Sequence, residues 1–197
     1  MASAAIVVGN PKAGSRTLTV AMEVMSQLSG CLGSASDPSA SDPSASDPSA
    51  DPSASGPLVV DLAEYTGSVF DWGSETMQGL TAEVAQCRLL VAASPTYKAT
   101  YTGLLKSFFD RYGNDGLRGV VAVPVMVGAA PIHALAPEVY LRPLFVELGA
   151  TVPARALYVM EQDIARLPEV VAKWAATARP LISTALFTGK AASEKEE

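Results

Sequence analysis

Five short apolar runs, separated by segments with helical periodicity, constrain the fold of this chain more than any other feature. Each run is almost continuously apolar and rich in branched residues, instead of alternating between apolar and polar positions. A strand of this kind is buried on both faces, which is typical of parallel sheets covered by helices on both sides. The predicted strands span residues 4–8, 58–62, 88–93, 120–127 and 151–158.

Apolar residues recur at i, i+3 and i+4 in the intervening segments, as on the buried face of a helix. Pro168 suits the first turn of the last helix, and Pro143 should kink the preceding helix near Val139. Five strand–helix units fit a flavodoxin-like, doubly wound α/β sheet with strand order 2-1-3-4-5 and helices on both faces. The helical positions are Leu18, Met22, Met25, Leu28, Leu32; Tyr101, Leu104, Leu105, Phe108, Tyr112; Leu141, Leu144, Phe145, Leu148; and Val170, Val171, Trp174, Ala178, Leu181, Leu186.

The composition fits one cytoplasmic domain. With 197 residues, 49% of them hydrophobic, the chain can bury one core. A net charge of −6 argues against nucleic-acid binding, which needs a basic face. Cys31 and Cys87 lack metal-ligand spacing and suit a reducing compartment. No signal peptide is recognised, and no apolar stretch approaches the ~20 residues of a membrane span, so we expect no membrane partner.

Residues 34–56 form a low-complexity segment of Ser, Ala, Asp and Pro. Such a segment buries no apolar surface, and its prolines exclude a helix. We therefore expect a disordered insertion within a single domain over residues 1–190, followed by a charged, disordered tail at 191–197. Because the insertion joins the first helix to the second strand, it should lie at the end of the sheet opposite the functional site.

A loop suited to a phosphate follows the first strand, at residues 9–17. Its glycines let backbone N–H groups turn inward, Ser15 and Thr17 offer hydroxyls, and Arg16 offers a planar set of donors. The helix that follows adds its free N–H groups and the positive end of its dipole. The spacing matches neither a P-loop nor the dinucleotide motif G-x-G-x-x-G. The loop therefore favours a monophosphate such as that of flavin mononucleotide (FMN).

Two further loops should lie beside the loop at residues 9–17. In an open α/β sheet, ligands bind outside the carboxyl ends of the strands, where the strand order reverses. Residues 94–100 follow the third strand and residues 128–133 follow the fourth, and both loops are rich in Gly, Pro or hydroxyl residues. In the first, Thr96 can hydrogen-bond a ring edge and Tyr97 can pack on a flat heteroaromatic ring. Taken alone, this loop is also compatible with an ordinary strand-to-helix turn.

The chain resembles the NAD(P)H-dependent FMN reductase family, particularly the flavin reductases of two-component monooxygenases. Three segments carry the resemblance. The first is Gly-x-Pro-x-x-x-Ser-Arg-Ser/Thr at residues 9–17, and the second is Pro-x-Tyr-Lys-x-x-Tyr/Phe-x-Gly-x-Leu-Lys at residues 95–106. The third is a glycine loop leading to His133, Tyr140 and Pro143. In some members, a tyrosine at the position of Tyr140 is tied to a local π-turn, in a region through which members form dimers or tetramers.

The resemblance implies which residues bind the cofactors. Ser15, Arg16 and Thr17 hold the FMN phosphate, and a loop of four residues lines the ribityl chain and the flavin ring. Gly128 and Ala129 lie near the pyrimidine edge of the ring, and Asn10 belongs to the phosphate loop. His133 either shapes the nicotinamide side of the pocket or only packs at the start of the fourth helix. The four lining residues are Pro95, Thr96, Tyr97 and Lys98.

Four positions depart from the family pattern. Ala129 and Ala130 stand where a second glycine and a hydroxyl are usual, and alanine tolerates a positive φ poorly. Either this loop is reshaped, or the amide that contacts the flavin comes from elsewhere. Asn10 stands where serine is frequent, and Ile132 where a small residue is usual.

We therefore expect an enzyme that transfers hydride from NADH or NADPH to FMN and supplies reduced flavin to a monooxygenase or another acceptor. No catalytic side chain or metal is expected, since stacked cofactors carry the hydride chemistry. One alternative is a quinone or azo reductase that retains FMN. A second is a flavodoxin-like electron carrier, which the arginine in the phosphate loop disfavours. The sequence does not distinguish NADH from NADPH, or a dimer from a tetramer.

Overall fold

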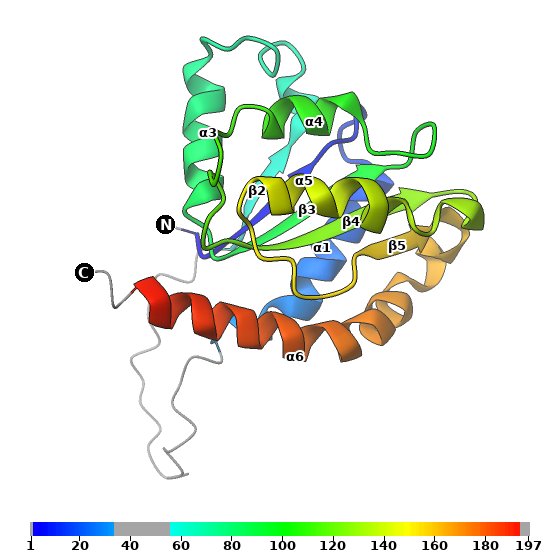
Figure 1. The fold of residues 1–197 in the computed structure, drawn as a ribbon. Coiled ribbons are helices and arrows are strands. Elements are labelled where there is room, and N and C mark those ends of the chain that lie inside the picture. The colour runs from blue at the N-terminus through cyan, green and yellow to red at the C-terminus, as the bar shows by residue number, and fades with distance from the viewer. Residues whose placement is uncertain (1, 34–55, 194–197) are drawn as a thin grey trace.

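The computed structural model describes residues 2–33 and 56–193. These residues form a single five-stranded sheet between two layers of helices (Figure 1). The expected insertion at 34–56 lies outside the described residues except for Gly56. No helix within the described ranges is long and apolar enough to cross a membrane.

All strands of the sheet run parallel, in the order β2-β1-β3-β4-β5. This arrangement confirms the predicted fold class and strand order. The residues of each central strand alternate between two apolar cores, one on each face, which explains the continuous apolar runs. The strands are β1 (Ala4–Val8), β2 (Leu58–Asp61), β3 (Leu89–Pro95), β4 (Val121–Gly128) and β5 (Leu157–Met160).

The start of the fifth strand was predicted wrongly. β5 begins at Leu157, and Thr151 makes only an isolated bridge with Val121. Pro153 lacks the N–H that a continuous strand would need. Two side chains bind the irregular backbone instead: the Arg142 guanidinium donates to Val152 O and Ala154 O (2.7 and 3.0 Å), and Glu138 Oε1 accepts from Ala156 N (2.7 Å).

Helices cover both faces of the sheet, as expected. α1 (Arg16–Leu28) and α6 (Leu167–Ser193) pack on one core, and α3 (Glu75–Ala85), α4 (Gly103–Phe109) and α5 (Arg142–Glu147) on the other (Figure 1). A short α2 (Gly30–Gly33) follows α1. Four other helical turns are η1 (Leu62–Tyr65), η2 (Pro131–His133), η3 (Pro137–Leu141) and η4 (Glu161–Arg166).

Three helical details differ from the predictions or sharpen them. The sequence reasoning missed α3, which buries only Met77 and Val84, although Ser74 caps its start. In α6 the predicted residue Leu181 is exposed, and Ile182 lies in the core instead. α6 also runs to Ser193, three residues into the range expected for the tail; residues 194–197 lie outside the described part of the chain.

The helix expected to kink near Val139 is divided into two segments. η3 (Pro137–Leu141) is a π-helix that contains Val139 and Tyr140, and α5 starts at Arg142 with Pro143 in its first turn. A proline in the first turn removes no helical hydrogen bond. The irregularity therefore lies at the expected position, and Pro143 begins an α-helix instead of interrupting one.

Thr102 fastens α4 to β1 and provides a test of this packing. Its hydroxyl accepts from Leu105 N (3.1 Å) as the helix cap and donates to Gly9 O. We expect Thr102→Ala to lower the free energy of unfolding by about 2 kcal/mol, since it removes a cap and a buried hydrogen bond. Urea denaturation measures this loss. Ser107→Ala, which removes a partly exposed hydroxyl from the same helix, is the control and should cost less than about 0.5 kcal/mol.

Candidate functional site

The carboxyl edge of the sheet brings the predicted loops together. In register, Val8 pairs with Ala93, so β1 and β3 release their loops side by side. Gly9 N donates to Ala93 O (2.8 Å), and Thr96 N donates to Val127 O (2.7 Å). These bonds join the loop after β1 to β3 and the loop after β3 to β4. The predicted meeting of three loops at this edge is therefore present.

The side chain of Asn10 joins two positions of the loop after β1 by hydrogen bonds. This side chain is 9% exposed, accepts from Lys12 N (2.9 Å) and donates to Thr17 Oγ1 (3.0 Å). Both ends of the amide are thus used inside the protein. The structure gives Asn10 the role of holding the loop and orienting Thr17.

The hydroxyls of Ser15 and Thr17 keep their protons available. Ser15 caps α1 by accepting from Leu18 N (3.3 Å), and Thr17 accepts from Asn10. A hydroxyl that accepts in this way can still donate. The first N–H groups of the helix also lack an acceptor within the helix. These donors at one helix start are suited to a phosphate.

Asp61 supports the same loop and was not identified from the sequence. It ends β2 and is 6% exposed; Oδ2 accepts from Gly14 N (3.1 Å) and Oδ1 from Ala63 N (3.3 Å). Gly14 has a φ of +61°, in the left-handed region that glycine adopts without strain. A carboxylate at the end of an apolar strand was the available signal, but its partner lies 47 residues away.

Arg16 lies at the start of α1 with its side chain 64% exposed. Its Nη1 is 3.2 Å from Oε2 of Glu161, the first residue of η4. Arg16, which the sequence predicts to bind a phosphate, therefore lies at the start of the helix that follows the loop. Its guanidinium is ion-paired with a carboxylate that the sequence reasoning did not consider.

A strained hairpin tip follows β3. Tyr97 and Thr100 exchange backbone hydrogen bonds of 2.9 and 3.2 Å, and the two residues between them, Lys98 and Ala99, have φ values of +51° and +70°. Two consecutive positive φ values are usually met by Asn or Gly, and strain of this kind collects at functional sites. Pro95 is buried, whereas Tyr97 (52%) and Lys98 are exposed, so the tyrosine ring is available to a ligand.

Thr96, Gly128 and Tyr158 meet below this tip. Thr96 Oγ1 is buried without a hydrogen bond of good geometry, although it lies near enough to Tyr158 to act on the pKa of that phenol. Tyr158 Oη donates to Ala130 O (2.8 Å) and fills the space that a Cβ on Gly128 would occupy. Burial raises the pKa of Tyr158, so the phenol keeps its donor proton at neutral pH. The sequence reasoning missed Tyr158 because it lies on another strand.

The loop after β4 does not use the backbone conformation that alanine tolerates poorly. Positive φ among the described non-glycine residues occurs at Lys98, Ala99 and Asp115, so Ala129 and Ala130 keep ordinary backbone angles. Ala129 is exposed, while Ala130 has φ −120° and caps η2. His133 is half-buried in η2, a turn separate from the following helix.

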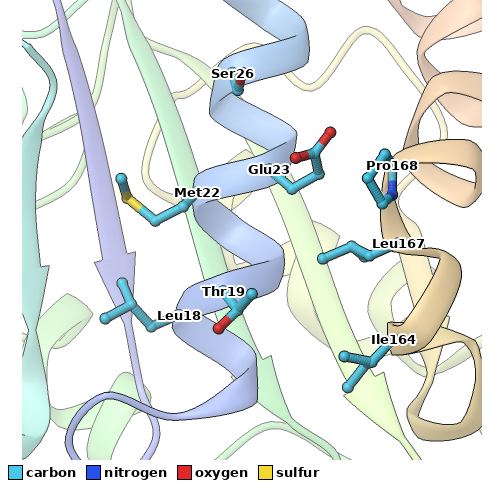
Figure 2. A pocket seen from close by; sticks show the side chains of 8 residues that line it. All are labelled: Leu18, Thr19, Met22, Glu23, Ser26, Ile164, Leu167 and Pro168. Atoms are coloured by element: carbon cyan, nitrogen blue, oxygen red, sulfur yellow. The ribbon is translucent and has the colours of Figure 1, made fainter.

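These features fit FMN. The start of α1 supplies donors for a phosphate, the hairpin tip supplies an exposed aromatic ring, and Thr96 supplies an unpaired buried hydroxyl between them. Among the described residues, no group of three His, Cys, Asp or Glu could hold a metal. A cavity of about 700 Å³ lies elsewhere, between α1 and the start of α6 (Figure 2), and none of the predicted site residues lines it.

The contact between Gly128 and Tyr158 predicts that one substitution reduces the stability loss caused by the other. Gly128→Ala should destabilise the protein by about 1–3 kcal/mol because the new methyl group collides with Tyr158 Oη. Tyr158→Phe alone should cost about 1 kcal/mol through the lost bond to Ala130. Because the phenylalanine removes the colliding oxygen, the double variant should be more stable than the sum of the two losses implies. Urea denaturation of the wild type, the two single variants and the double variant gives the coupling free energy. Stability losses that simply add would contradict this packing.

Comparisons with known proteins bear on the family and the fold. The model of the NADPH-dependent FMN reductase family matches residues 2–164. The NADH-dependent FMN reductase SfnF of Pseudomonas putida is 39% identical over 88 residues, which cover 45% of this chain and 47% of SfnF. The FMN reductase (NADPH) of Escherichia coli K12 is 34% identical over 77 residues, which cover 39% of this chain and 40% of that enzyme. The chain thus spans about half the length, or less, of these curated relatives.

Solved structures share the fold across almost the whole chain. The apo form of the NADH:FMN oxidoreductase EmoB has a TM-score of 0.66 at 21% identity, covering 90% of both chains. An oxidoreductase from Corynebacterium diphtheriae has a TM-score of 0.68 at 22% identity, covering 92% of this chain and 97% of that one. The structural likeness shows the fold, and the family model covers most of the chain. This chain belongs to the NADPH-dependent FMN reductase family.

Proposed function

We propose that this protein is an NAD(P)H-dependent FMN reductase that passes hydride from a nicotinamide to FMN. The observation that carries the proposal is the donor set at the start of α1, placed beside the exposed ring of Tyr97. Family membership supports it, as do the relatives named as FMN reductases.

The residues of the site would bind and orient rather than react. FMN, when bound, supplies the hydride acceptor. Ser15, Thr17 and the first N–H groups of α1 would hold its phosphate, and Arg16 would add charge. Tyr97 and Thr96 would fix the ring, and the buried Pro95 and Gly128 would support the two loops from behind. Holding two rings in contact is the main requirement of such a transfer.

Several finer points belong to the same proposal. Relatives are named for both NADH and NADPH, so we propose that either nicotinamide serves. His133 would line the nicotinamide side, and the reduced flavin would pass to a flavin-dependent monooxygenase or another acceptor. The free, buried Cys31 and Cys87 support a cytoplasmic location.

A steady-state assay separates this function from its alternatives. Oxidation of NADH or NADPH that rises with added free FMN supports the reductase. Flavin that co-elutes through gel filtration, with turnover on a quinone or azo dye, supports the retained-FMN enzyme. Flavin binding without nicotinamide oxidation would indicate an electron carrier and would contradict the proposal.

Arg16→Ala tests the phosphate site. We expect a ten- to hundredfold loss of FMN affinity, because a guanidinium–phosphate contact contributes about 1.5–3 kcal/mol. Riboflavin, which lacks the phosphate, should lose less than about threefold. Titration by flavin fluorescence measures both, and Lys12→Ala, which removes an exposed cation from the same loop, is the matched control. Equal losses for the two flavins would make Arg16 structural.

We also propose that the protein self-associates through the segment that contains η2, η3 and α5. Five exposed large apolar side chains fall within residues 131–147, and exposed apolar patches often mark interfaces. They are Ile132 (84%), Leu135 (59%), Val139 (55%), Tyr140 (47%) and Val146 (57%).

Sedimentation tests this assembly. Val139→Lys should shift the protein towards the monomer, because a charge at the centre of an apolar contact costs more than the contact gains. The control is Phe187→Lys, which changes an equally exposed side chain (58%) on α6 and should leave the assembly intact. Dissociation by both variants, or by neither, would place the interface elsewhere.

A further inference from the structure

Glu161 lies where it can oppose the binding of a phosphate. It directly follows β5, and Arg16 begins α1 at the same edge of the sheet. Two strands, β3 and β4, stand between β1 and β5. The ion pair between Glu161 and Arg16 (3.2 Å) therefore links the end of the last strand to the start of the first helix.

The packing of η4 keeps the backbone that carries Glu161 close to α1. Ile164, three residues further along η4, packs on the same core as α1. Figure 2 shows the side chains of Ile164 and Leu167 directed towards α1, the helix that Arg16 begins. The packing of η4 thus places the backbone of Glu161 near the start of α1, and the ion pair joins its carboxylate to the guanidinium.

A carboxylate and a phosphate compete for the same guanidinium. Both are anions, and both bind the fork of N–H donors that arginine presents. A phosphate that takes Arg16 must displace Glu161 or lie close to its charge, and like charges at such distances repel. The pair is exposed (64% and 41%), so the opposition is modest.

We propose that Glu161 sets the affinity for FMN by holding Arg16 and opposing the phosphate, so that the flavin exchanges readily. This inference rests on the proposed function. A weaker hold on the phosphate favours the use of FMN as a dissociable substrate over its retention. Glu161 acts through Arg16 and touches no reacting atom.

The test is Glu161→Gln, which keeps the size of the side chain and removes its charge. We expect FMN to bind about three- to fivefold more tightly, because an exposed ion pair contributes up to about 1 kcal/mol, and riboflavin to change less than twofold. Asp163→Asn is the matched control. It removes the same charge from the same turn, but Asp163 pairs with Arg166 (2.8 Å), so FMN affinity should change less than twofold.

The substitution Glu161→Gln in the Arg16→Ala variant tests whether Glu161 acts through Arg16. In Arg16→Ala, the further change Glu161→Gln should improve FMN binding by less than half of its gain in the wild type. Fluorescence titration of apo-protein gives all of these affinities without turnover. FMN affinity that is unchanged or lower in Glu161→Gln overturns the inference, as does an equal gain for riboflavin. A wild type that binds no FMN overturns the proposed function itself, which is a different result.

Discussion

The site depends on the junction between β1 and β3 in the middle of the sheet. Gly9 continues the register of β1 by donating to Ala93 O, and the Thr102 hydroxyl binds the carbonyl of the same glycine. Thr102 N in turn donates to Ser94 Oγ (3.0 Å). A Cβ on Gly9 would collide with Leu105 of α4, so only glycine lets the helix approach this closely. The phosphate loop and the hairpin tip are side by side because of these contacts.

Unfavourable backbone angles and an unsatisfied buried polar group occur at this edge of the sheet, whereas the core is filled with well-packed apolar side chains. Both faces of the sheet are filled with apolar side chains at almost every position. At the carboxyl edge, by contrast, Lys98 and Ala99 have positive φ, and Thr96 keeps an unpaired buried hydroxyl. Such departures cost free energy, and a folded protein tolerates them where a ligand repays the cost. Their concentration around one edge agrees with the position that the topology alone gives to a ligand.

Sequence reasoning succeeded where structure is local and failed where it depends on distant partners. β1, β3 and β4 are continuous apolar runs, and their order follows from the parallel sheet, so both were predictable. The start of β5 was not, because the backbone near Pro153 is bound by Arg142 and Glu138 from another element. The motif residues Ser15, Arg16 and Thr17 do gather at one helix start. Asp61 of β2 supports the loop after β1, Tyr158 of β5 contacts the loop after β4, and Glu161 of η4 pairs with Arg16. No motif connects these three residues to the sites they contact.

These supporting residues bear on the affinity of the site more than on its chemistry. A dissociation constant in the micromolar range corresponds to about 8 kcal/mol, and each tenfold change to about 1.4 kcal/mol. One guanidinium contact therefore changes the dissociation constant of a flavin by one or two orders of magnitude, which separates a flavin that exchanges from one that is retained. If Arg16 were free, the same loop would bind the phosphate more tightly. On the proposed function, an exposed carboxylate at the end of β5 gives the fold a way to adjust flavin release without altering the surfaces that hold the ring.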